Sequence, residues 1–465
     1  MHDHKHAGPA PNGSLSRRRF LGGAAAAAAF TIVPSHVLGG KPRRAPSEKL
    51  HVAGVGLGVM GCENLRNCGE DVVAVCDVDW TLAAEGFKRF PKAAKYEDYR
   101  RMLDKHRGID AVIVATPDHT HAVITADAIR RGKHVYTQAP LAHDVWEARQ
   151  LTKLAREAGV VTQMGNERHS GPDIRKACEY VWSGTLGAVR KVHCWTNRPR
   201  WAQGMARPKD TPPTPPKLRW DLWLGPAPKR PYHPAYHPCD WRGWVDFGTG
   251  ALGAMGCHIL DAPFWALKLD QADTFTVEAS STGTNGETWP KAATVRYRFG
   301  ARGDMPPVTV TWFDGGRRPP RPPELPKTRR HVGSNGTFFI GEKCKMALGP
   351  VISGTRAGQA GPRLMPESLM ASARPKQTIP RVKFDRTIWV QGSRHELEWI
   401  TACKKGRQPC SSFATAGPLT EMVLLGNVAL LVGKPIEWDR KKLAIPNNPA
   451  ANNYIRQPPR PGWTV

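Results

Sequence analysis

The feature that most constrains the fold is a glycine-rich turn, Gly56-Leu57-Gly58-Val59-Met60-Gly61. An apolar run at Leu50–Val55 precedes it and predicts a buried strand, and Cys62–Cys68 can continue as a helix. In this setting the first glycine makes a tight turn, the second lets the backbone approach a pyrophosphate, and the third lets helix and strand lie close together. The positive end of the helix then faces the phosphates. The turn therefore predicts a dinucleotide-binding site.

An acidic residue stands where such a site needs one. A second apolar run, Val72–Cys76, ends in Asp77, which lies 21 residues after Gly56. The carboxylate that binds the adenosine ribose hydroxyls is expected about 20 residues after the glycine turn. An ordinary glycine turn in an α/β protein does not require this full order of strand, turn, helix, strand and acid. We therefore predict that Asp77 binds the ribose.

The chain is strongly basic. Its 465 residues include 67 Lys and Arg against 40 Asp and Glu, which gives a net charge of +27. Such an excess can attract nucleic acid, anionic envelope polymers or acidic sugars. The sequence has neither a compact basic block with interleaved aromatic residues nor a nucleic-acid motif, so we expect a basic solvated surface and no nucleic-acid partner. The ten cysteines are scattered without a C-x-x-C pair, so we predict neither a disulfide framework nor a metal site.

The first forty residues have the features of an export signal. Ser16–Leu21 carries twin arginines followed by Phe-Leu, and Gly22–Val33 is a short apolar stretch. That stretch is shorter than the roughly 20 residues of a membrane span, so we expect no stable span in the mature chain. The pattern predicts a twin-arginine signal and a location in the periplasm or cell envelope. The alternatives are an uncleaved anchor, because no clean cleavage site is present, and a flexible basic N-terminus.

From Glu48 to Asn166 strand patterns alternate with helical patterns. Strands are expected at 50–55, 72–76, 111–115, 134–137 and 160–164, with helices between them. This alternation predicts a doubly wound parallel sheet, a Rossmann fold. Ligands of such sheets lie at the carboxyl ends of the strands. The residues expected to line that crevice are Asp77, Thr116, Pro117, Gln138, Ala139, Pro140 and Asn166.

After Asn166 the sequence predicts a second domain. It has long loops rich in Pro and Trp, further strands at 189–196, 274–281, 294–299, 308–313 and 337–340, and helices at 174–183, 394–403 and 420–432. The predicted organisation is a signal segment at 1–40, a linker at 41–48, a nucleotide-binding domain at 49–168, a second domain at 169–440 and an extended tail at 441–465.

The chain resembles the Gfo/Idh/MocA oxidoreductases, especially exported members with a twin-arginine signal. The resemblance runs from about Leu50 to Trp438 and rests on motifs in both halves of this stretch. The motifs are Gly56–Gly61, Cys76–Asp79, Ala115–His121, Gly132–Tyr136, Gln163–Asn166, Trp220–Pro226 and Gly256–Asp261. Together they are specific for the family but not for a substrate.

The resemblance implies an N-terminal Rossmann domain and a C-terminal α+β domain with an open, mainly antiparallel sheet that often mediates oligomers. It also implies hydride transfer between NAD or NADP and a sugar or related alcohol. Asp77 favours NAD, because a carboxylate repels a 2′-phosphate. We therefore expect NAD, a small-molecule carbohydrate and a homo-oligomer. The residues expected to bind the cofactor are Gly56, Leu57, Gly58, Val59, Met60, Gly61, Asp77, Val78, Thr116, Pro117, His121, Gln138 and Asn166.

Two residues of the family's usual catalytic set are missing. Where the family has Glu-Lys-Pro, this chain has Gln138-Ala139-Pro140, and the Asp that stands four residues before the family's active-site histidine is Ala254. Of the usual Lys, Asp and His, only His258 remains. Histidine changes charge near neutral pH, so His258 is the candidate base for a hydroxyl proton. The alternative is that His258 forms bonds within the second domain.

Several loop residues have side chains that suit a sugar, through ring stacking and hydrogen bonds to hydroxyl groups. The same tryptophans can instead anchor the long loops. The candidates are Arg198, Trp201, Tyr236, His237, Trp241 and Arg242. Near the glycine turn, His121 is expected to face the crevice and His119 to be structural.

Three functions remain open from the sequence. The first is an exported NAD-dependent oxidoreductase of sugars with altered proton handling. The second is an NAD-dependent glycosidase, in which transient oxidation of the sugar labilises the glycosidic bond. The third is a binding protein that keeps the fold and the nucleotide but has lost turnover. His258 favours the first two functions, whereas Ala139 and Ala254 together favour the third.

Overall fold

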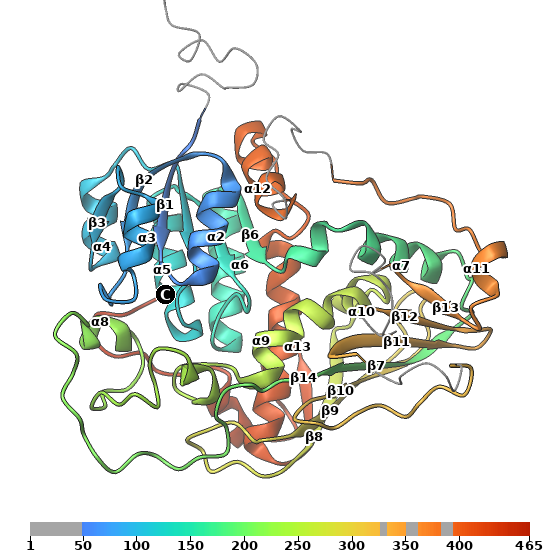
Figure 1. Ribbon diagram of the computed structural model, residues 1–465. Coiled ribbons are helices and arrows are strands. Elements are labelled where there is room, and N and C mark those ends of the chain that lie inside the picture. The colour runs from blue at the N-terminus through green and yellow to red at the C-terminus, as the bar shows by residue number, and fades with distance from the viewer. Residues whose placement is uncertain (1–48, 326–332, 350–360, 383–393) are drawn as a thin grey trace, which may run out of the picture. The chain divides into compact units, whose positions relative to one another are not determined.

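The computed structural model describes residues 49–325, 333–349, 361–382 and 394–465 (Figure 1). The predicted signal at 1–40 and the linker at 41–48 lie outside these residues, as does part of the Pro- and Arg-rich loop after residue 325. The described chain contains a six-stranded sheet and an eight-stranded sheet. The predicted fold class, a Rossmann sheet followed by an α+β domain, is confirmed.

The N-terminal sheet has the strand order β3-β2-β1-β4-β5-β6, and each neighbouring pair is parallel. Its central strands β1 and β4 are buried apart from His51 at the start of β1, and they read as apolar runs because the sheet is covered on both faces. All strands therefore end at the same edge. The strands are β1 (His51–Val55), β2 (Asp71–Cys76), β3 (Ala94–Tyr96), β4 (Ala111–Val114), β5 (His134–Gln138) and β6 (Thr162–Gly165).

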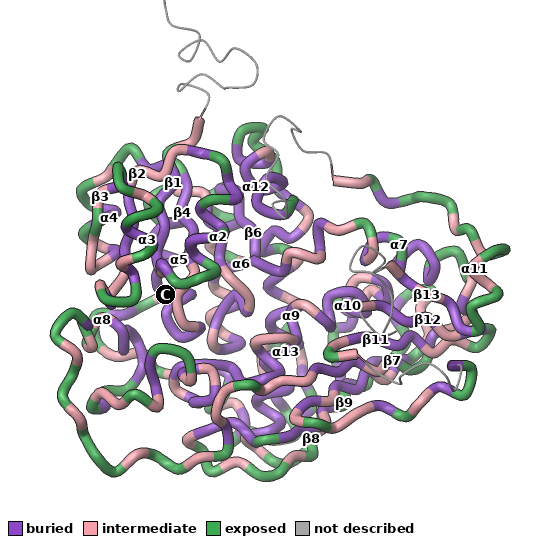
Figure 2. Tube along the Cα trace, in the orientation of Figure 1, coloured by how far each residue is buried: buried purple, intermediate pink, exposed green. Residues whose placement is uncertain are grey.

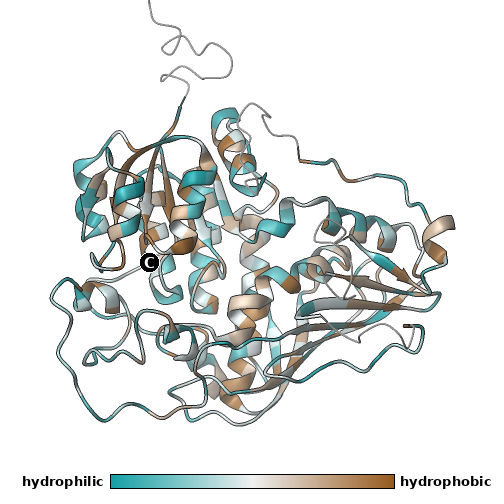
Figure 3. Cartoon of the chain, viewed as in Figure 1, coloured by the Kyte–Doolittle hydropathy of each residue, from teal (hydrophilic) through white to brown (hydrophobic). Residues whose placement is uncertain are grey.

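Helices cover both faces of this sheet. On one face the core contains residues of α2 (Val59–Cys68), α3 (Ala84–Arg89) and α12 (Arg394–Lys405). On the other face lie α4 (Tyr99–Lys105), α5 (Asp118–Arg130) and α6 (Val145–Ala158). Hydrophobic residues gather in the strands, and hydrophilic residues lie on the outer sides of the helices (Figure 3).

The second sheet has the order β13-β12-β11-β7-β10-β9-β8-β14. Its pairs are antiparallel except for β7 with β10, which are parallel, so the prediction of a mainly antiparallel sheet is confirmed. The strands are β7 (Val189–Thr196), β8 (Thr274–Ser281), β9 (Ala293–Phe299), β10 (Val308–Phe313), β11 (Asn335–Gly341), β12 (Lys345–Leu348), β13 (Arg363–Met365) and β14 (Ile436–Asp439).

One face of the second sheet carries helices, and the other is more open (Figure 2). On the open side Glu278 forms ion pairs with Arg296 and Arg298 across neighbouring strands. The helices of this part are α7 (Pro172–Trp182), α8 (Trp220–Leu224), α9 (Gly250–Ile259), α10 (Asp261–Ala266), α11 (Leu369–Ser372) and α13 (Phe413–Val432). Short 3₁₀ turns include η2 (Glu167–Ser170), η3 (Asp240–Gly243), η4 (Leu269–Gln271) and η5 (Pro449–Tyr454).

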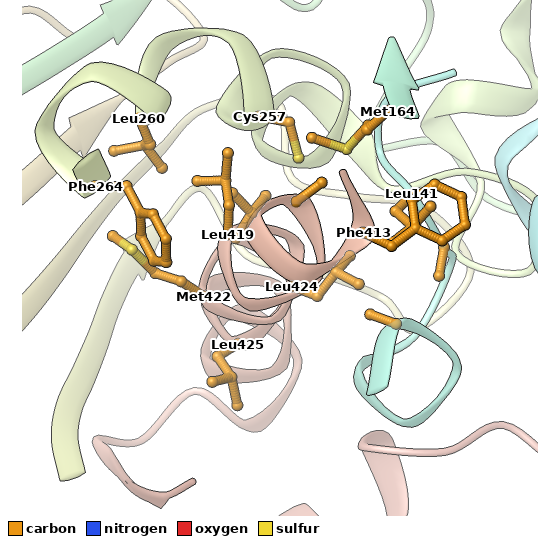
Figure 4. Close-up of a cluster of buried hydrophobic side chains, with 14 of the residues drawn as sticks. Leu141, Met164, Cys257, Leu260, Phe264, Phe413, Leu419, Met422, Leu424 and Leu425 are labelled. Carbon is orange, nitrogen blue, oxygen red and sulfur yellow. The ribbon is translucent and has the colours of Figure 1, made fainter. Parts of the chain in front are cut away.

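Helix α13 lies between the two parts of the fold. Its side chains meet Leu141 and Met164 from the Rossmann part, and Cys257 and Phe264 from the second part (Figure 4). It is also the one described helix that is long and apolar enough to cross a membrane, but most of it is buried in this core. The two sheets therefore share a hydrophobic core around α13.

The structure differs from the expected elements in a few places. Helix α13 begins at Phe413, earlier than the expected 420, and continues through Pro418. Proline removes one backbone donor, but Pro418 lies within the first turns of this helix and does not end it. Strand β3 has three residues and β14 has four, which is too short for a clear alternating pattern.

Candidate active site

The glycine turn joins β1 to α2 at the carboxyl edge of the N-terminal sheet. Gly56 has a φ of +88°, in the left-handed region that favours glycine, and a Cβ on it would lie 2.5 Å from the carbonyl oxygen of Ala115. A Cβ on Gly61 would lie 1.9 Å from the carbonyl oxygen of Gly56. A Cβ on Gly58 would meet no protein atom within 4 Å. The first and third glycines are thus required by the chain itself, and the second leaves open space for a ligand.

The N-terminus of α2 is free to bind an anion. Gly58 is the N-cap residue, and neither a capping side chain nor an acidic residue occupies the first turn. The first N–H groups of an α-helix have no partner within the helix, and they carry the positive end of its dipole. This arrangement fits the pyrophosphate of a dinucleotide.

Asp77 follows β2 and is fixed beside the glycine turn. Its carboxylate accepts hydrogen bonds from the backbone N–H of Leu57 at 2.7 Å and of Asp79 at 2.9 Å. Burial raises the pKa of Asp77, and these two backbone donors act in the opposite direction. Carboxylate oxygens can accept further bonds, so ribose hydroxyls fit here, whereas a 2′-phosphate would meet a like charge.

A cavity of about 320 Å³ lies at the carboxyl ends of β1, β2 and β4. Its volume is in the range of small-molecule and cofactor sites. The predicted cofactor residues that line it are Gly56, Gly58, Val59, Met60, Asp77, Val78, Thr116 and Pro117. The structure therefore brings most of that predicted set to one cavity.

Two other predicted cofactor residues are buried beside the cavity. Leu57 takes part through its backbone N–H, which donates to Asp77. The ring nitrogens of His121 lie 2.8 Å from the carbonyl oxygens of Pro140 and of Thr116. His121 thus ties together two loops at the strand ends and does not line the cavity.

His119, expected to be structural, is fully enclosed. Its ring nitrogens lie 3.1 Å from the carbonyl oxygen of Phe247 and 2.9 Å from that of Trp223. Burial lowers the pKa of His119 to about 3, so its imidazole is neutral. These contacts attach the start of α5 to the second part of the chain.

Half of the predicted sugar-binding residues lie at the Asp77 end. His237, Trp241 and Arg242 line the same cavity as Asp77. His237 Nε2 lies 2.8 Å from Asp79 Oδ2, and the Arg242 guanidinium lies 4.1 Å from the centre of a Trp241 ring. These residues therefore stand beside the ribose end of a bound dinucleotide.

The other predicted sugar-binding residues do not line this cavity. Tyr236 is buried in an aromatic cluster with Trp244 and Phe247. Trp201 Nε1 donates to Gln203 Oε1 at 2.8 Å, and Arg198 is half-buried nearby. Tyr236 thus serves as a packing anchor, a role that the sequence analysis considered only for the tryptophans of these loops.

The opposite end of the site lies at β5 and β6. Gln138 Nε2 donates to Asn64 Oδ1 at 2.7 Å, which fixes the amide against α2. Asn166 is buried; its Nδ2 donates to Asp261 at 3.2 Å, and its Oδ1 accepts from Ser411 at 2.5 Å. Both amides are therefore fixed by hydrogen bonds within the protein. Asn166 in this way holds the start of the segment that follows it.

That segment supplies a carboxylate that the sequence analysis missed. Glu167 Oε2 lies 3.6 Å from Nδ1 of His258, and both side chains are partly exposed. Position 254, where the family has its Asp, is alanine on the same helix, α9. The only sequence signal for Glu167 is its place directly after the strand end at Asn166, at the edge where ligands bind. The His258–Glu167 pair combines a titratable imidazole with an orienting carboxylate.

Asp77 and Glu167 follow different strands of the N-terminal sheet and stand at the same carboxyl edge. Asp77 follows β2 and Glu167 follows β6, and the strands between them are β1, β4 and β5. Four strand spacings correspond to about 19 Å. An extended dinucleotide that lies across the strand ends therefore has its ribose acid at one end and His258 at the other.

Behind this end a buried ion pair fixes the backbone. His169 Nδ1 lies 2.8 Å from Asp261 Oδ1, and the His169 ring stacks on Trp265. Burial by itself lowers the pKa of His169, but the charge and hydrogen bond of Asp261 outweigh it and raise the pKa to about 10. Asp261 also bonds Asn166, so the pair holds both sides of the segment that carries Glu167.

Within the described ranges, no group of three His, Cys, Asp or Glu side chains is placed to hold a metal ion. The residues at the Asp77 end fit a dinucleotide, and those at the Glu167 end offer an imidazole and a carboxylate. The site can therefore hold a nucleotide cofactor and move a proton.

Comparisons with known proteins agree with this arrangement. Residues 50–166 match the model of an oxidoreductase family described as an NAD-binding Rossmann fold. Residues 174–303 match the C-terminal alpha/beta domain model of the same family. The N-terminal part is thus an NAD-binding Rossmann domain.

Curated relatives share part of the chain. An inositol 2-dehydrogenase of Rubrobacter xylanophilus is 35% identical over 158 residues, which cover 33% of this chain and 45% of that protein. A levoglucosan dehydrogenase of Pseudarthrobacter phenanthrenivorans is 28% identical over 187 residues, which cover 40% of each protein. Less than half the length of each relative is matched.

Solved structures share the fold over most of the chain. A levoglucosan dehydrogenase in complex with NADH and levoglucosan has a TM-score of 0.54 at 17% identity, covering 83% of this chain and 99% of that one. The WlbA dehydrogenase of Bordetella pertussis, in complex with NADH and UDP-GlcNAcA, has a TM-score of 0.56 at 14% identity, covering 84% and 99%. Both family models match, one in each half of the fold, and the chain belongs to the Gfo/Idh/MocA oxidoreductase family.

Proposed function

We propose that this protein is an NAD-dependent oxidoreductase that moves a hydride between NAD and a hydroxyl-bearing carbon of a sugar or sugar-like alcohol. The observation that carries the proposal is the His258–Glu167 pair, which lies beside the end of β6 at the carboxyl edge of the sheet. The inositol and levoglucosan dehydrogenases among the relatives support a small carbohydrate as the substrate.

Bound NAD supplies a nicotinamide ring that accepts or donates a hydride. The chain's own residues hold the cofactor at Gly58 and Asp77 and handle the proton of the substrate hydroxyl. His258 takes that proton at Nε2 as a general base. Glu167 Oε2 lies 3.6 Å from Nδ1 and orients the ring, as a carboxylate does beside a catalytic histidine.

This proton handling differs from the family's usual arrangement. Ala139 and Ala254 replace the Lys and the Asp that normally assist the histidine. In our proposal Glu167 reaches His258 from the start of η2, directly after β6, and takes the place of the Asp on α9. Ala139 itself offers no acid or base in place of the lysine, and a single general acid or base typically contributes about 10²–10⁴ in rate. We therefore expect slow turnover compared with relatives that have the complete set.

The roles of the pair can be tested with variants of the full chain. We expect His258→Ala to lower kcat by about 10²–10⁴-fold and to leave the Kd for NAD unchanged, because a base acts on the hydroxyl proton and not on the nucleotide. Glu167→Gln should lower kcat by a smaller factor. The matched control is His193→Ala, which removes a half-buried imidazole from β7, in the second sheet. Equal kcat for His258→Ala and the wild type would contradict the proposed base.

The two other functions remain as outcomes of assays on the wild type. Hydrolysis of aryl glycosides that depends on NAD would identify the glycosidase reaction. Tight NAD binding without any turnover would identify the degenerate protein, and turnover created by Ala139→Lys with Ala254→Asp would support that outcome. Oxidation of a free polyol with release of NADH is the outcome our proposal expects.

We also propose that the protein is exported as a folded, cofactor-loaded chain and assembles as a homo-oligomer. The twin arginines within Ser16–Leu21 support the export route. Cell fractionation of the wild type and of an Arg17→Lys, Arg18→Lys double variant tests it, because the variant should stay in the cytoplasm. Light scattering of the purified protein tests the oligomer.

A further inference from the structure

The C-terminal tail returns to the N-terminal sheet, where its end marks the carboxyl edge of the strands (Figure 1). The carbonyl oxygen of Ile455 accepts a hydrogen bond from Trp146 N–H at 3.0 Å, and Gln457 N–H donates to Asp144 at 2.9 Å. Arg460 then donates from Nε to the carbonyl oxygen of Gly225 at 2.8 Å. The tail is thus fixed to the body of the protein at several points along its path.

Trp463 stands at the end of this tail and faces the cavity. Its indole is 8% exposed, and the cavity that it lines also contains Gly58 and Asp77. The Arg100 guanidinium lies 4.5 Å from the centre of a Trp463 ring, and the Tyr99 ring lies 6.4 Å away and lines the same cavity. An aromatic side chain from the last residues therefore lines the same cavity as the predicted ribose acid.

The loop after β2, which carries Asp77, is fixed by the second part of the chain. Arg219 N–H donates to the carbonyl oxygen of Val78 at 2.9 Å, and Trp80 N–H donates to that of Lys217 at 3.1 Å. His237 adds the contact to Asp79. Residues 217–219 and His237 thus hold this loop in place. The position of Asp77 in the cavity that Trp463 also lines is therefore fixed by the fold.

We propose that Trp463 is a cofactor-binding residue whose indole, with Tyr99, forms the wall against which the adenine of NAD lies. Adenine is flat and presents π-faces, and aromatic side chains bind such faces by stacking. Asp77 is the predicted ribose ligand, so the base attached to that ribose lies in the same cavity. The proposal concerns the adenosine half of the cofactor and rests on the NAD-binding domain, independently of which sugar is oxidised.

The proposal predicts that affinity is lost only for ligands that contain adenosine. For Trp463→Ala we expect a Kd for NAD, and for ADP-ribose, that is about 10-fold weaker or more, consistent with loss of one stacked aromatic group. Nicotinamide mononucleotide, which lacks adenosine, should bind as it does to the wild type. Isothermal titration calorimetry of the full-length protein measures all three ligands.

Two further variants make the test specific. Tyr454→Ala is the matched control, because Tyr454 is an exposed aromatic residue of the same tail that does not line the cavity. Trp463→Leu keeps apolar bulk at the tail anchor but offers no aromatic face, so it should also weaken ADP-ribose if Trp463→Ala does not fold. Unchanged affinity of Trp463→Leu for ADP-ribose, or an equal loss for nicotinamide mononucleotide, would overturn the proposal. Failure of the sugar assays would leave it intact.

Discussion

At the scale of single residues, the most consequential contact behind the site is the ion pair of His169 with Asp261. The pKa of His169 is about 10 in the folded protein, well above the usual value of about 6.5 in an unfolded chain. A raised histidine pKa stabilises the fold fully below the unfolded value. That contribution is lost as the pH rises through about 10. The pair therefore makes the folded protein less stable as the pH becomes alkaline.

This linkage predicts the behaviour of a His169→Gln variant. At pH 6 we expect it to be less stable than the wild type by about 3–5 kcal/mol, because it leaves a buried carboxylate without its cation. The difference should shrink as the pH rises from 6.5 toward 10, where His169 in the wild type loses its charge. Urea unfolding followed by circular dichroism at several pH values measures it. A gap that stays constant over this range would show that His169 is neutral in the folded protein.

Backbone spacing alone could place Asp77 beside the glycine turn, because the second strand of a Rossmann sheet ends next to that turn. That Asp77 binds the ribose stays a prediction. Glu167 could not be placed in this way, because its approach to His258 depends on how η2 and α9 meet, and no local pattern encodes that meeting. The position of the sugar candidates Trp241 and Arg242 could not be predicted for the same reason. Their loop folds back to the cavity that Asp77 lines.

At the scale of elements, two glycines at the start of α2 are expected to have different roles, one in binding NAD and the other in stability. A Cβ on Gly58 has open space, whereas a Cβ on Gly61 would overlap the carbonyl oxygen of Gly56. We expect Gly58→Ala to keep the wild-type Tm without ligand but to bind NAD weakly, because its methyl group occupies the space of the pyrophosphate. Gly61→Ala should lose about 1–3 kcal/mol of stability through overpacking. Thermal unfolding with and without NAD distinguishes the two, and wild-type NAD affinity in Gly58→Ala would contradict the assigned site.

Elements with a long apolar run or a clear apolar pattern were also the ones that the sequence predicted. The strands at 111–115 and 134–137 and the helix at 394–403 are close to β4, β5 and α12 in the structure. The missed start of α13 has a tertiary cause. A Cβ on Gly417 would lie 1.9 Å from Thr152 Oγ1, so this first half of the helix is held closely against α6 despite Pro418.

At the scale of the whole molecule, the chain crosses between its two parts more than once. Helix α12 comes late in the sequence, yet Trp399 and Ile400 belong to the core on one face of the N-terminal sheet. Helix α13 lies against α6 and also against β8 of the second sheet. The tail then places Trp463 in the cofactor cavity. The order of segments could be predicted from the sequence. The packing of α12, α13 and the tail against the N-terminal part could not, because it depends on contacts between residues far apart in the chain.

The proposed reaction of this site is the transfer of a hydride between a carbohydrate and NAD. The most direct measurement is a single turnover: purified protein loaded with NAD is mixed with inositol, levoglucosan and other polyols, and the absorbance of NADH is followed. The account predicts that at least one polyol produces NADH with the wild type, and that His258→Ala, with the same amount of bound NAD, produces it far more slowly. Bound NAD that stays oxidised with every polyol tested, and bound NADH that stays reduced with the corresponding ketones, would contradict it.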